Sequence, residues 1–265
     1  MTNSDGDPSG AAPGRIKSAD RTILLLELLA DSERSLTFTE IQKAMGVPKS
    51  SLSGLLQTLR SRGWIESRDR GHTYEIGLRA LRVGTEYLDR DPVVAASASA
   101  LTELSEAIDE TVNLARLDGG SILHLASRET HHHLRVGSRI GGRLPAHATA
   151  LGLALLAERS WEEVDALLPD PLPALTPETV VDRQQLKATL EEARTRGWAR
   201  ERDQSTPGIT CFGMAIPGSE GYPVDSISCE IPTARVTDEL EKVVIEHLSH
   251  AVRTVARNLR VGRTG

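Results

Sequence analysis

Short polar side chains and leucines both recur at helical spacing between residues 48 and 62. One face of a helix here would bury four leucines, namely Leu52, Leu55, Leu56 and Leu59. The outward face would carry a cation, hydroxyls and an amide, namely Lys49, Ser50, Ser51, Ser53 and Gln57. A lysine can neutralise a phosphate, a serine can donate to a phosphate or base edge, and a glutamine can pair with an adenine edge. The pattern predicts a helix that lies in the major groove of DNA.

A second group of cations follows that helix. Arg68 and Arg70 fall in a polar connection between two short segments with strand character. Strands are expected at 64–67 and 73–76. Gly71 in the connection can take the positive φ of a tight hairpin turn, and an arginine at such a tip can enter a minor groove or grip the DNA backbone. With Thr39, these residues complete the set expected to contact DNA.

Capping and turn signals predict the elements that would position these side chains. Thr37 and Glu40 have the spacing of a capping box, so a helix is expected from 38 to 45. Gly46 can end that helix in a left-handed conformation, and Pro48 fits the first turn of the next helix. The expected order is therefore helix, tight turn, helix.

The flanking segments extend this arrangement into a module. A helix is expected from Ser18, whose hydroxyl can cap it, to about Ala30. Residues 16–77 are then predicted to form a winged helix-turn-helix DNA-binding domain, and the polar residues 1–15 a disordered tail. A helical hairpin with a solvated polar face is the alternative interpretation of the same pattern.

Charge is unevenly divided along the 265 residues, whose net charge is −6. Residues 15–90 hold 13 Lys and Arg against 10 Asp and Glu, whereas residues 91–265 hold 18 against 25. A basic module on an acidic body is expected if only one part meets phosphates. No run of about 18 apolar residues occurs, and the N-terminus has no apolar segment, which favours a cytoplasmic protein over an exported or membrane-spanning one.

Residues 92–262 are predicted to form a second domain, joined to the first by a linker helix within 78–91 that Pro92 ends. Strands are expected at 111–117, 121–127, 131–137, 210–216 and 224–230. Helices are expected at 93–109, 148–157, 160–168, 182–196 and 237–260. This alternation predicts an α+β fold class, in which helices pack on an antiparallel sheet.

Motifs along the whole chain resemble successive signatures of IclR-family transcriptional regulators. In the first half they are Ile16–Arg21, Met45–Ser50, Leu55–Leu59 with Gly63–Ile65, and Tyr74–Gly77. In the second half they are Asp109–Leu114, Leu144–Gly152, Arg196–Ala199 and Gly208–Cys211. The resemblance implies a DNA-binding regulator without enzymatic activity or cofactor, with repression favoured over activation. Its GAF-like C-terminal domain would bind a small-molecule effector and assemble a homodimer or homotetramer. Gly54 departs from the family, which usually carries an arginine there.

The same resemblance implies an effector pocket in the C-terminal domain. The lining would come from three strands, the start of a helix, and a loop that holds Glu201 and Ile209. The residues implied are His133, Ala150, Leu151, Glu201, Ile209, Cys211, Ser228 and Glu230. Ser228 and Glu230 are two apart on an expected strand, so they face one side while Cys229 faces the other. Exposed amides at the helix start near Ala150 could hold an anion.

Glu230 stands where such proteins often have a small hydroxyl residue. A carboxylate in a partly dry pocket repels an anionic ligand and accepts hydrogen bonds from an amide, amine or hydrazide. We therefore expect an effector that is neutral or carries an amine. The alternative is that Glu230 reaches solvent or pairs with a nearby arginine.

The histidines and cysteines require that metal binding, catalysis and redox sensing be considered. The residues concerned are His124, His131, His132, His133, His147 and Cys211, whose spacing matches no compact zinc signature, so a metal site is not expected. No nucleophile elbow, Gly-rich phosphate loop or paired-carboxylate motif favours an enzyme. Cys211 and Cys229 are expected to be buried thiols, and the alternative second domain is a purely structural platform or a redox sensor that uses one of them.

Overall fold

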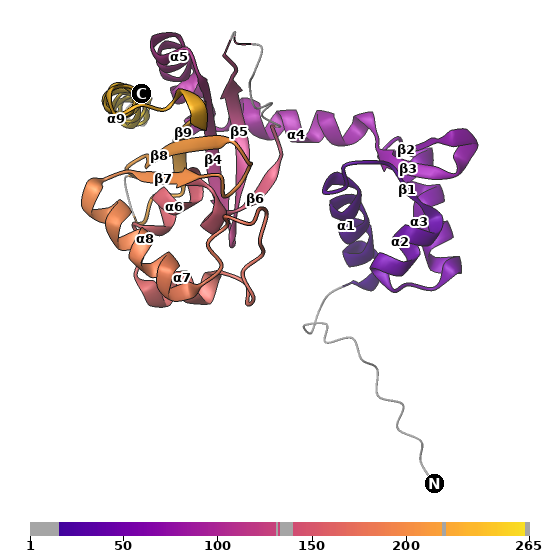
Figure 1. The fold of residues 1–265 in the computed structure, drawn as a ribbon. Coiled ribbons are helices and arrows are strands. Elements are labelled where there is room, and N and C mark those ends of the chain that lie inside the picture. The colour runs from indigo at the N-terminus through magenta and orange to yellow at the C-terminus, as the bar shows by residue number, and fades with distance from the viewer. Residues whose placement is uncertain (1–15, 131, 133–139, 219–220, 263–265) are drawn as a thin grey trace. The chain divides into compact units, whose positions relative to one another are not determined.

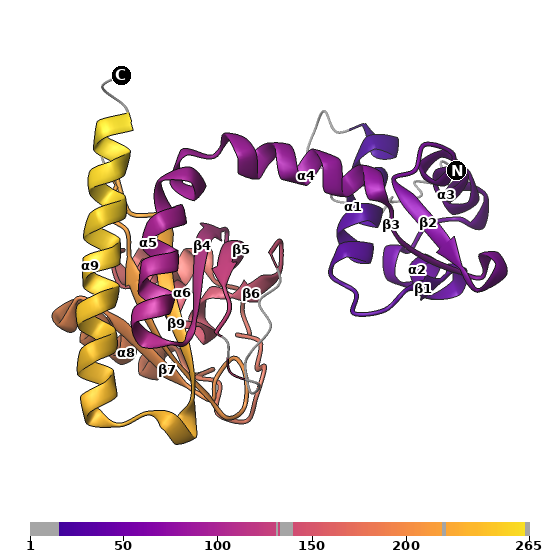
Figure 2. The same ribbon diagram turned by 90° about the horizontal axis from the view of Figure 1, so that it is seen from above.

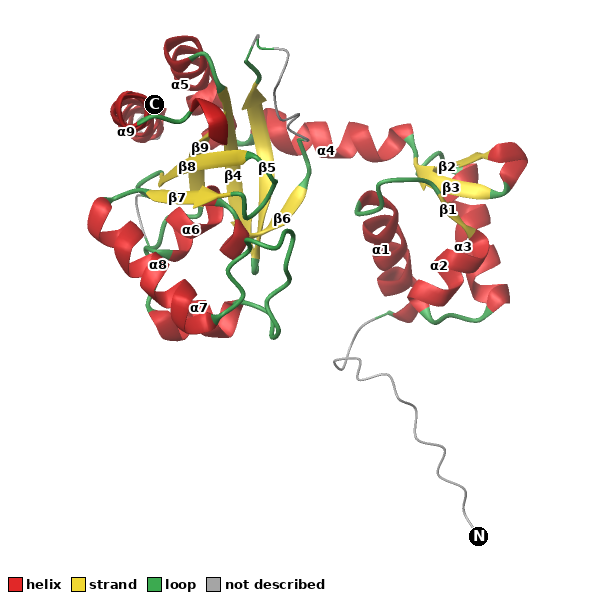
Figure 3. Cartoon of the chain, viewed as in Figure 1, coloured by secondary structure: helices red, strands yellow, loops and turns green. Residues whose placement is uncertain are grey.

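The computed structural model describes residues 16–130, 132, 140–218 and 221–262 (Figure 1). The chain divides into two compact units, Met1–Tyr87 and Leu88–Gly265. The first contains short helices and a small sheet, and the second a larger sheet between helices (Figure 3). This confirms the predicted α+β class; the predicted tail, residues 1–15, lies outside the described residues. Among the described helices, none combines the length and apolarity needed to span a bilayer.

Three helices frame the first unit: α1 (Lys17–Ala30), α2 (Phe38–Met45) and α3 (Lys49–Ser61). The predicted capping box begins α2, because Glu40 N–H donates to Thr37 Oγ1 at 3.3 Å and Thr37 N–H donates to Glu40 Oε2 at 2.8 Å. Gly46 ends α2 with a φ of 63°, as predicted. Helix, tight turn and helix therefore follow one another as expected.

Two helix starts differ from the prediction. No side chain caps α1, whose N-cap is Ile16, so the expected cap at Ser18 is wrong and this serine lies inside the first turn. Pro48 is the extended N-cap residue of α3, with φ −60° and ψ 144°, and is not its first helical residue. The cap of α1 lies two positions before Ser18, and α3 begins one position after Pro48, differences that are within the precision of end signals.

A three-stranded antiparallel sheet forms the wing, in the order β1 (Leu36–Thr37), β3 (Thr73–Ile76) and β2 (Ile65–Arg68). The short strand β1 is not predicted, because two residues carry no alternation of apolar and polar side chains. Between β2 and β3 lies a 3₁₀ turn, Asp69–Gly71, in which all three residues have positive φ. The sequence predicts this conformation for Gly71 alone.

Buried apolar side chains from all three helices and the wing form one core in the first unit. They are Leu25, Leu29, Ile41, Val47, Leu52, Leu56, Leu59 and Ile65. The next helix, α4 (Leu78–Arg90), has the predicted span but buries none of its residues. Its large apolar side chains therefore remain exposed at Leu78, Leu81, Val83 and Tyr87.

A six-stranded sheet organises the second unit, and every pair of neighbouring strands is antiparallel. Its order is β6 (Arg143–Pro145), β5 (Ser121–Arg128), β4 (Thr111–Asp118), β9 (Asp225–Pro232), β8 (Ile209–Ala215) and β7 (Ala199–Arg202). The first and last of these, β6 and β7, are absent from the prediction. Both are short edge strands, and the alternating charges of β7 resemble those of a loop.

Helices cover both faces of this sheet. On one face α5 (Pro92–Ile108) and α9 (Asp238–Gly262) lie side by side (Figure 2) and share a core with the sheet. The other face carries α6 (Ala150–Leu156), α7 (Trp161–Leu167) and α8 (Arg183–Arg196). Along β9, Ile227 and Cys229 belong to the α5 and α9 core, so Ser228 and Glu230 face α6. The predicted alternation is thus confirmed; the strand expected at 131–137 lies outside the described residues.

Candidate nucleic-acid and small-molecule sites

The outward face of α3 carries polar side chains that the module leaves exposed. Leu52, Leu56 and Leu59 are almost completely buried, at 0, 3 and 6% exposed, and fix the helix to the core. The predicted contact residues Lys49, Ser50, Ser53 and Gln57 are all exposed on the remaining surface of the helix. Thr39 is exposed in the first turn of α2. These side chains can donate or accept hydrogen bonds without any change of fold.

Ser51 differs from the other residues of the set. It is half-buried, and its Oγ accepts a hydrogen bond from Arg21 Nη1 of α1 at 3.2 Å. The sequence places Ser51 on the outward face, whereas the structure places it at the edge that faces α1. Its hydroxyl therefore helps to hold the two helices together.

The two arginines of the wing also differ. Arg68 ends β2, where its Nε donates to Glu75 Oε1 at 2.6 Å and its Nη2 lies 3.6 Å from Glu66 Oε2. Arg70 lies in the turn itself, is exposed, and forms no ion pair with a described residue. Arg70 is the cation that the wing presents at its tip, because the charge of Arg68 is balanced by its own sheet.

Gly54 lies in the middle of α3 on its exposed side. An added Cβ at this position would meet no atom within 4 Å, and the residue has ordinary helical geometry. Packing therefore does not require a glycine here. Its absent side chain leaves a gap in the polar face between Ser53 and Gln57.

Two cross-strand rows line the face of the larger sheet that α6 covers. In the first row, Thr111 of β4 pairs with Glu230 of β9, which pairs with Cys211 of β8 and then Glu201 of β7. In the second row, Asn113 pairs with Ser228, which pairs with Gly213. Glu201 lies on a strand and Ile209 begins another, so their predicted position in a loop is wrong. The register brings four of the predicted pocket residues to one face, namely Glu201, Cys211, Ser228 and Glu230.

Polar atoms in these rows are buried without hydrogen-bond partners. Asn113 is 0% exposed and Ser228 is 1% exposed. Within the described part of the chain, both amide atoms of Asn113, Ser228 Oγ and Glu230 Oε2 have no hydrogen-bond partner. Buried polar atoms are usually satisfied, and leaving one unsatisfied costs about 1–3 kcal/mol. A cluster of them on adjacent strands is a candidate ligand site.

The two carboxyl groups of the first row are not equivalent. Glu201 is 1% exposed, and its oxygens accept from Gln204 N–H at 2.9 Å and Ser205 Oγ at 2.8 Å. Burial raises the pKa of Glu201 in spite of these bonds. Burial, with the charge of Glu201 added to it, raises the pKa of Glu230 to about 7. Glu230 therefore changes its charge near neutral pH, whereas its neighbour has its hydrogen bonds already made.

Helix α6 begins directly above these rows. Thr149 caps it by accepting from Gly152 N–H at 3.0 Å, and Ser226 Oγ donates to Leu151 O at 3.1 Å. A Cβ on Gly213 would lie 2.3 Å from Ala150 O, so only glycine permits this approach. Ala150 and Leu151 lie at the helix start as predicted, but both are buried. The expectation that the amides at this helix start are exposed is therefore wrong, and anion binding there stays a prediction.

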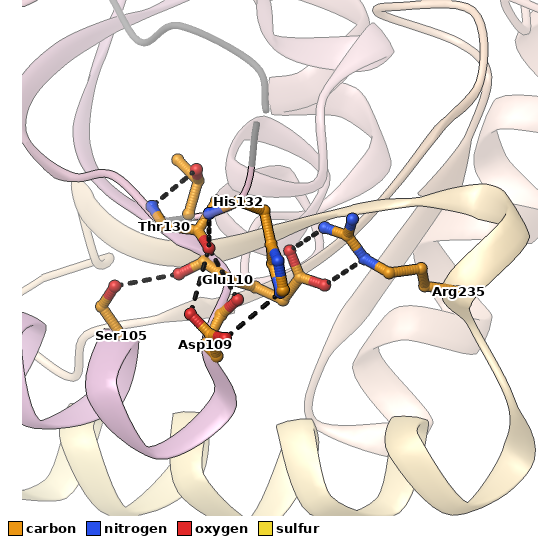
Figure 4. Close-up of polar contacts among 7 residues, drawn as sticks. Ser105, Asp109, Glu110, Thr130, His132 and Arg235 are labelled. Carbon is orange, nitrogen blue, oxygen red and sulfur yellow. Dashed lines mark hydrogen bonds and ion pairs between the residues drawn. The ribbon is translucent and has the colours of Figure 1, made fainter. Parts of the chain in front are cut away.

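A polar cluster fixes the first residues of β4 beside the rows (Figure 4). Glu110 is buried, and Arg235 binds both of its oxygens, with distances of 2.8 and 2.6 Å. Ser105 Oγ donates to Glu110 O, and Thr130 Oγ1 donates to Asp109 O. The cation of this region is thus matched to Glu110, whereas no described arginine or lysine pairs with Glu230. Of the two alternatives for Glu230, pairing with an arginine has no support among the described residues, whereas contact with solvent agrees with its half-buried position.

The histidines and cysteines show other arrangements. His132 Nε2 lies 3.2 Å from Asp109 Oδ2 (Figure 4), while His131 and His133 lie outside the described residues. Among the residues that the structure describes, no three His, Cys, Asp or Glu are grouped as metal ligands. Cys211 and Cys229 are free and buried, as predicted, and burial raises the pKa of both thiols. This opposes the accessible thiolate that redox sensing requires.

Asn113 is a member of the candidate site that the sequence-based set omits. The signal is present in the sequence, because Asn113 alternates with Val112 and Leu114 on an expected strand and so must face the other side of the sheet. A buried amide among apolar strand residues is expensive unless it is used. Alternation alone could have identified it.

Comparisons with known proteins give matches over both parts of the chain. Residues 18–69 match the IclR helix-turn-helix domain, and residues 85–257 match the bacterial transcriptional regulator IclR C-terminal domain. The chain is 33% identical over 232 residues to the transcriptional repressor IclR of Escherichia coli strain K12, covering 86% of this chain and 84% of that protein. An IclR transcriptional regulator from Alicyclobacillus acidocaldarius has a similar fold, with a TM-score of 0.81, 21% identity, and 92 and 99% of the two chains covered. An IclR homologue from Microbacterium hydrocarbonoxydans, crystallised with 4-hydroxybenzoate, has a TM-score of 0.73 at 24% identity, with 92 and 99% covered.

Proposed function

Because this chain belongs to the IclR family of bacterial transcriptional regulators, we propose that α3 reads operator DNA and that the second unit binds a small-molecule effector. The observation that carries the proposal is the exposure of the polar face of α3, while Leu52, Leu56 and Leu59 are buried and Leu55 is half-buried. We assign DNA binding to residues 16–77, linkage to 78–91, and effector binding and oligomerisation to 92–262. The protein is a regulator and not an enzyme, and repression in the cytoplasm is the favoured role.

Each exposed side chain of the DNA-reading face has a chemical role. Gln57 and Ser53 can reach base edges, while Lys49 and Ser50, at the start of α3, suit phosphate contacts. Thr39 adds a hydroxyl from α2, and Arg70 carries the wing's cation. Ser51 and Arg68 do not face the DNA freely, because each is bonded within the protein. Ser51 accepts a hydrogen bond from Arg21, and Arg68 donates one to Glu75. We expect removal of either to alter DNA binding indirectly.

The exposed apolar surface of the first unit supports a homodimer. Leu78, Leu81, Val83 and Tyr87 lie exposed on α4, and Ile23 and Leu24 lie exposed on α1. Large apolar side chains left exposed on two helices of a small module are typical of an interface. Two modules on a two-fold axis would read a pseudo-palindromic operator with half-sites about 34 Å apart or a multiple of this. Sedimentation of Leu81→Asp should show monomers; an unchanged dimer or tetramer would exclude α4 as the contact.

The effector site is assigned to the buried rows of the larger sheet. Asn113, Ser228 and Glu230 supply polar atoms without partners, and Cys211 lies between the two glutamates of its row. Ala150 and Leu151 close the site from α6, and Ile209, at the start of β8, packs with Ala150 and Cys211. His133, which the resemblance adds to the lining, lies outside the described residues. A ligand that satisfies the unpaired atoms would stabilise this arrangement of strands.

A triad of charged side chains connects the sheet that holds the effector site to the end of the linker helix. Arg116 of β4 binds Asp225 of β9 at 2.7 Å and Asp91 at 2.5 Å. Asp91 follows α4 directly and caps α5 by accepting from Val93 N–H at 2.9 Å. The strands β4 and β9 that hold the unpaired atoms therefore also hold the end of the linker. An effector acts if it binds one placement of α4 more tightly than another.

Gel retardation of the DNA upstream of the protein's own gene, at low salt, tests the assignment. The wild type should shift the fragment, and Gln57→Ala should weaken binding about tenfold or more. Gln184→Ala is the matched control, because Gln184 is an exposed glutamine of α8 in the other unit. A wild type that fails to retard the fragment, or equal losses in the two variants, would contradict the proposed function.

A further inference from the structure

The chemistry of the α6-facing rows restricts the class of ligand that can bind there. The cations of β4, β7, β8 and β9 are Arg116, Arg200 and Arg202. Arg116 binds Asp91 and Asp225, and Arg200 binds Glu241 of α9 at 3.0 Å, both on the opposite face. Arg202 has the same strand parity as Arg200 and lies 3.5 Å from Asp203. These four strands therefore direct carboxylates, and no cation, to the α6 face.

Glu230 is the acidic group of this face that remains incompletely paired. The buried carboxylate of Glu110 has Arg235, and that of Glu201 has Gln204 N–H and Ser205 Oγ. Glu230 Oε2 has no hydrogen-bond partner among the described residues. Glu230 as a whole is half-buried, but its Oε2 atom is buried, and a buried carboxylate oxygen without a partner is unfavourable. A protonated amine is the ligand group that relieves this cost most directly.

The side chains of the second row determine which hydrogen-bonding groups the rest of the ligand must carry. Asn113 offers an amide N–H pair and a carbonyl, and Ser228 offers a hydroxyl that can donate or accept; none of these atoms is engaged within the described chain. Asn113 and Ser228 are cross-strand partners, so their side chains lie about 5 Å apart. They are one strand repeat from Glu230, which is a separation of about 7 Å. A polar group that both donates and accepts fits this end.

We propose that the effector is a small cation, whose ammonium or amidinium group binds Glu230 and whose amide or hydroxyl group, about 7 Å away, binds Asn113 and Ser228. The proposal rests on the assignment of this face as the effector site. It also excludes a simple carboxylate such as the 4-hydroxybenzoate bound by the Microbacterium homologue. An anion would add a third buried negative group beside Glu201 and Glu230 without a described strand cation to balance it.

Three compounds with one carbon skeleton test the proposal on the full-length protein. They are 5-aminopentanamide, which is a cation with an amide, glutaramide, which is neutral, and glutaramate, which is an anion. Calorimetric titration at pH 8 measures their affinities. We expect 5-aminopentanamide to bind at least about tenfold more tightly than glutaramate, with glutaramide between them.

Variants assign the charge recognition to one side chain. Glu230→Gln preserves the shape of the residue and removes the buried charge, and it should weaken binding of 5-aminopentanamide about tenfold or more while glutaramide is little affected. Ser228→Ala should weaken all three compounds to a similar extent. Glu241→Gln, on the α9 face, is the control and should bind like the wild type.

Two results would overturn the cation assignment. One is tighter binding of glutaramate than of 5-aminopentanamide; the other is equal binding of 5-aminopentanamide by the wild type and Glu230→Gln, including no binding to either at millimolar concentration. Operator retardation by the same preparations separates these failures from failure of the proposed function. A protein that shifts DNA but rejects the cation keeps its regulatory role and loses only the ligand class.

Discussion

The outward face of α3 and the α6-facing rows of the larger sheet both offer polar atoms without partners in the described chain, but they do so at different cost. Gln57 and Ser53 are exposed, so water satisfies them until a ligand replaces it. Asn113 and Ser228 are at most 1% exposed, and water reaches them poorly. Polar groups on an exposed surface cost little folding free energy, because water hydrogen-bonds to them. Buried polar groups without partners lower the stability of the fold, so a ligand that bonds to all of them gains the most binding free energy. Polar groups at the two sites should therefore respond differently to substitution.

The largest effect is expected where buried charges are already satisfied. Arg116→Met would leave Asp91 and Asp225, both 7% exposed, without their shared cation. The second unit should lose about 3–5 kcal/mol of unfolding free energy, because two buried carboxylates become uncompensated. Urea unfolding followed by far-UV circular dichroism measures this. Arg202→Met is the control, because Arg202 is exposed and its aspartate lies 3.5 Å away; similar losses would show that the triad does not carry the stability.

The next largest effect separates the two faces of α3. Leu52→Ala should destabilise the first unit by about 2–5 kcal/mol, because the side chain is 0% exposed and its removal leaves a cavity. Ser53→Ala, one residue along, should change stability by less than about 0.5 kcal/mol and act on operator affinity instead. Thermal unfolding and gel retardation of the two variants distinguish these outcomes. Comparable destabilisation by both would mean that the polar face is part of the core.

A third prediction concerns the charge of Glu230. Its pKa is raised to about 7 in the folded protein from an ordinary value of 4.5, so the folded state favours the protonated form. That contribution to stability is complete below pH 4.5 and is lost as the pH rises to about 7. The unfolding free energy of the wild type, relative to Glu230→Gln, should therefore fall by at most about 3 kcal/mol over this interval.

Denaturant unfolding of the wild type and Glu230→Gln at several pH values measures that difference. Glu201, Cys211 and His124 are the other titratable side chains that the described strands direct to this face. All three are present in both proteins, so their contributions largely cancel. A difference that stays constant from pH 4.5 to 7.5 would show that Glu230 is hydrated and would weaken the contrast between the two regions.

The sequence predicts the exposed site better than the buried one, for a physical reason. Helix α3 is specified locally, by the leucine period, the Gly46 stop and the capping box before it. The buried rows depend on register between strands that are distant in sequence, such as Thr111 with Glu230. The family resemblance places Glu201 in a loop, and the edge strand β7 that holds it is not predicted, since its alternating charges resemble those of a loop. The pairing of Arg68 with Glu75 likewise depends on the cross-strand geometry of the wing.

The smallest effect is expected at Gly54, where the polar face of α3 lacks a side chain. At Gly54 an added side chain meets no atom within 4 Å, so nothing in the packing opposes a larger residue. Gly54→Ala should raise the unfolding free energy of the first unit by about 0.5–1 kcal/mol, because glycine is a poor helix former. Gly54→Arg should gain a similar amount and also tighten operator binding, since it adds a cation between Ser53 and Gln57. Thermal unfolding and gel retardation of both variants separate the two contributions. Stabilisation by alanine with weaker binding by arginine would show that the operator approaches α3 closely here, so that the glycine is required by the DNA and not by the fold.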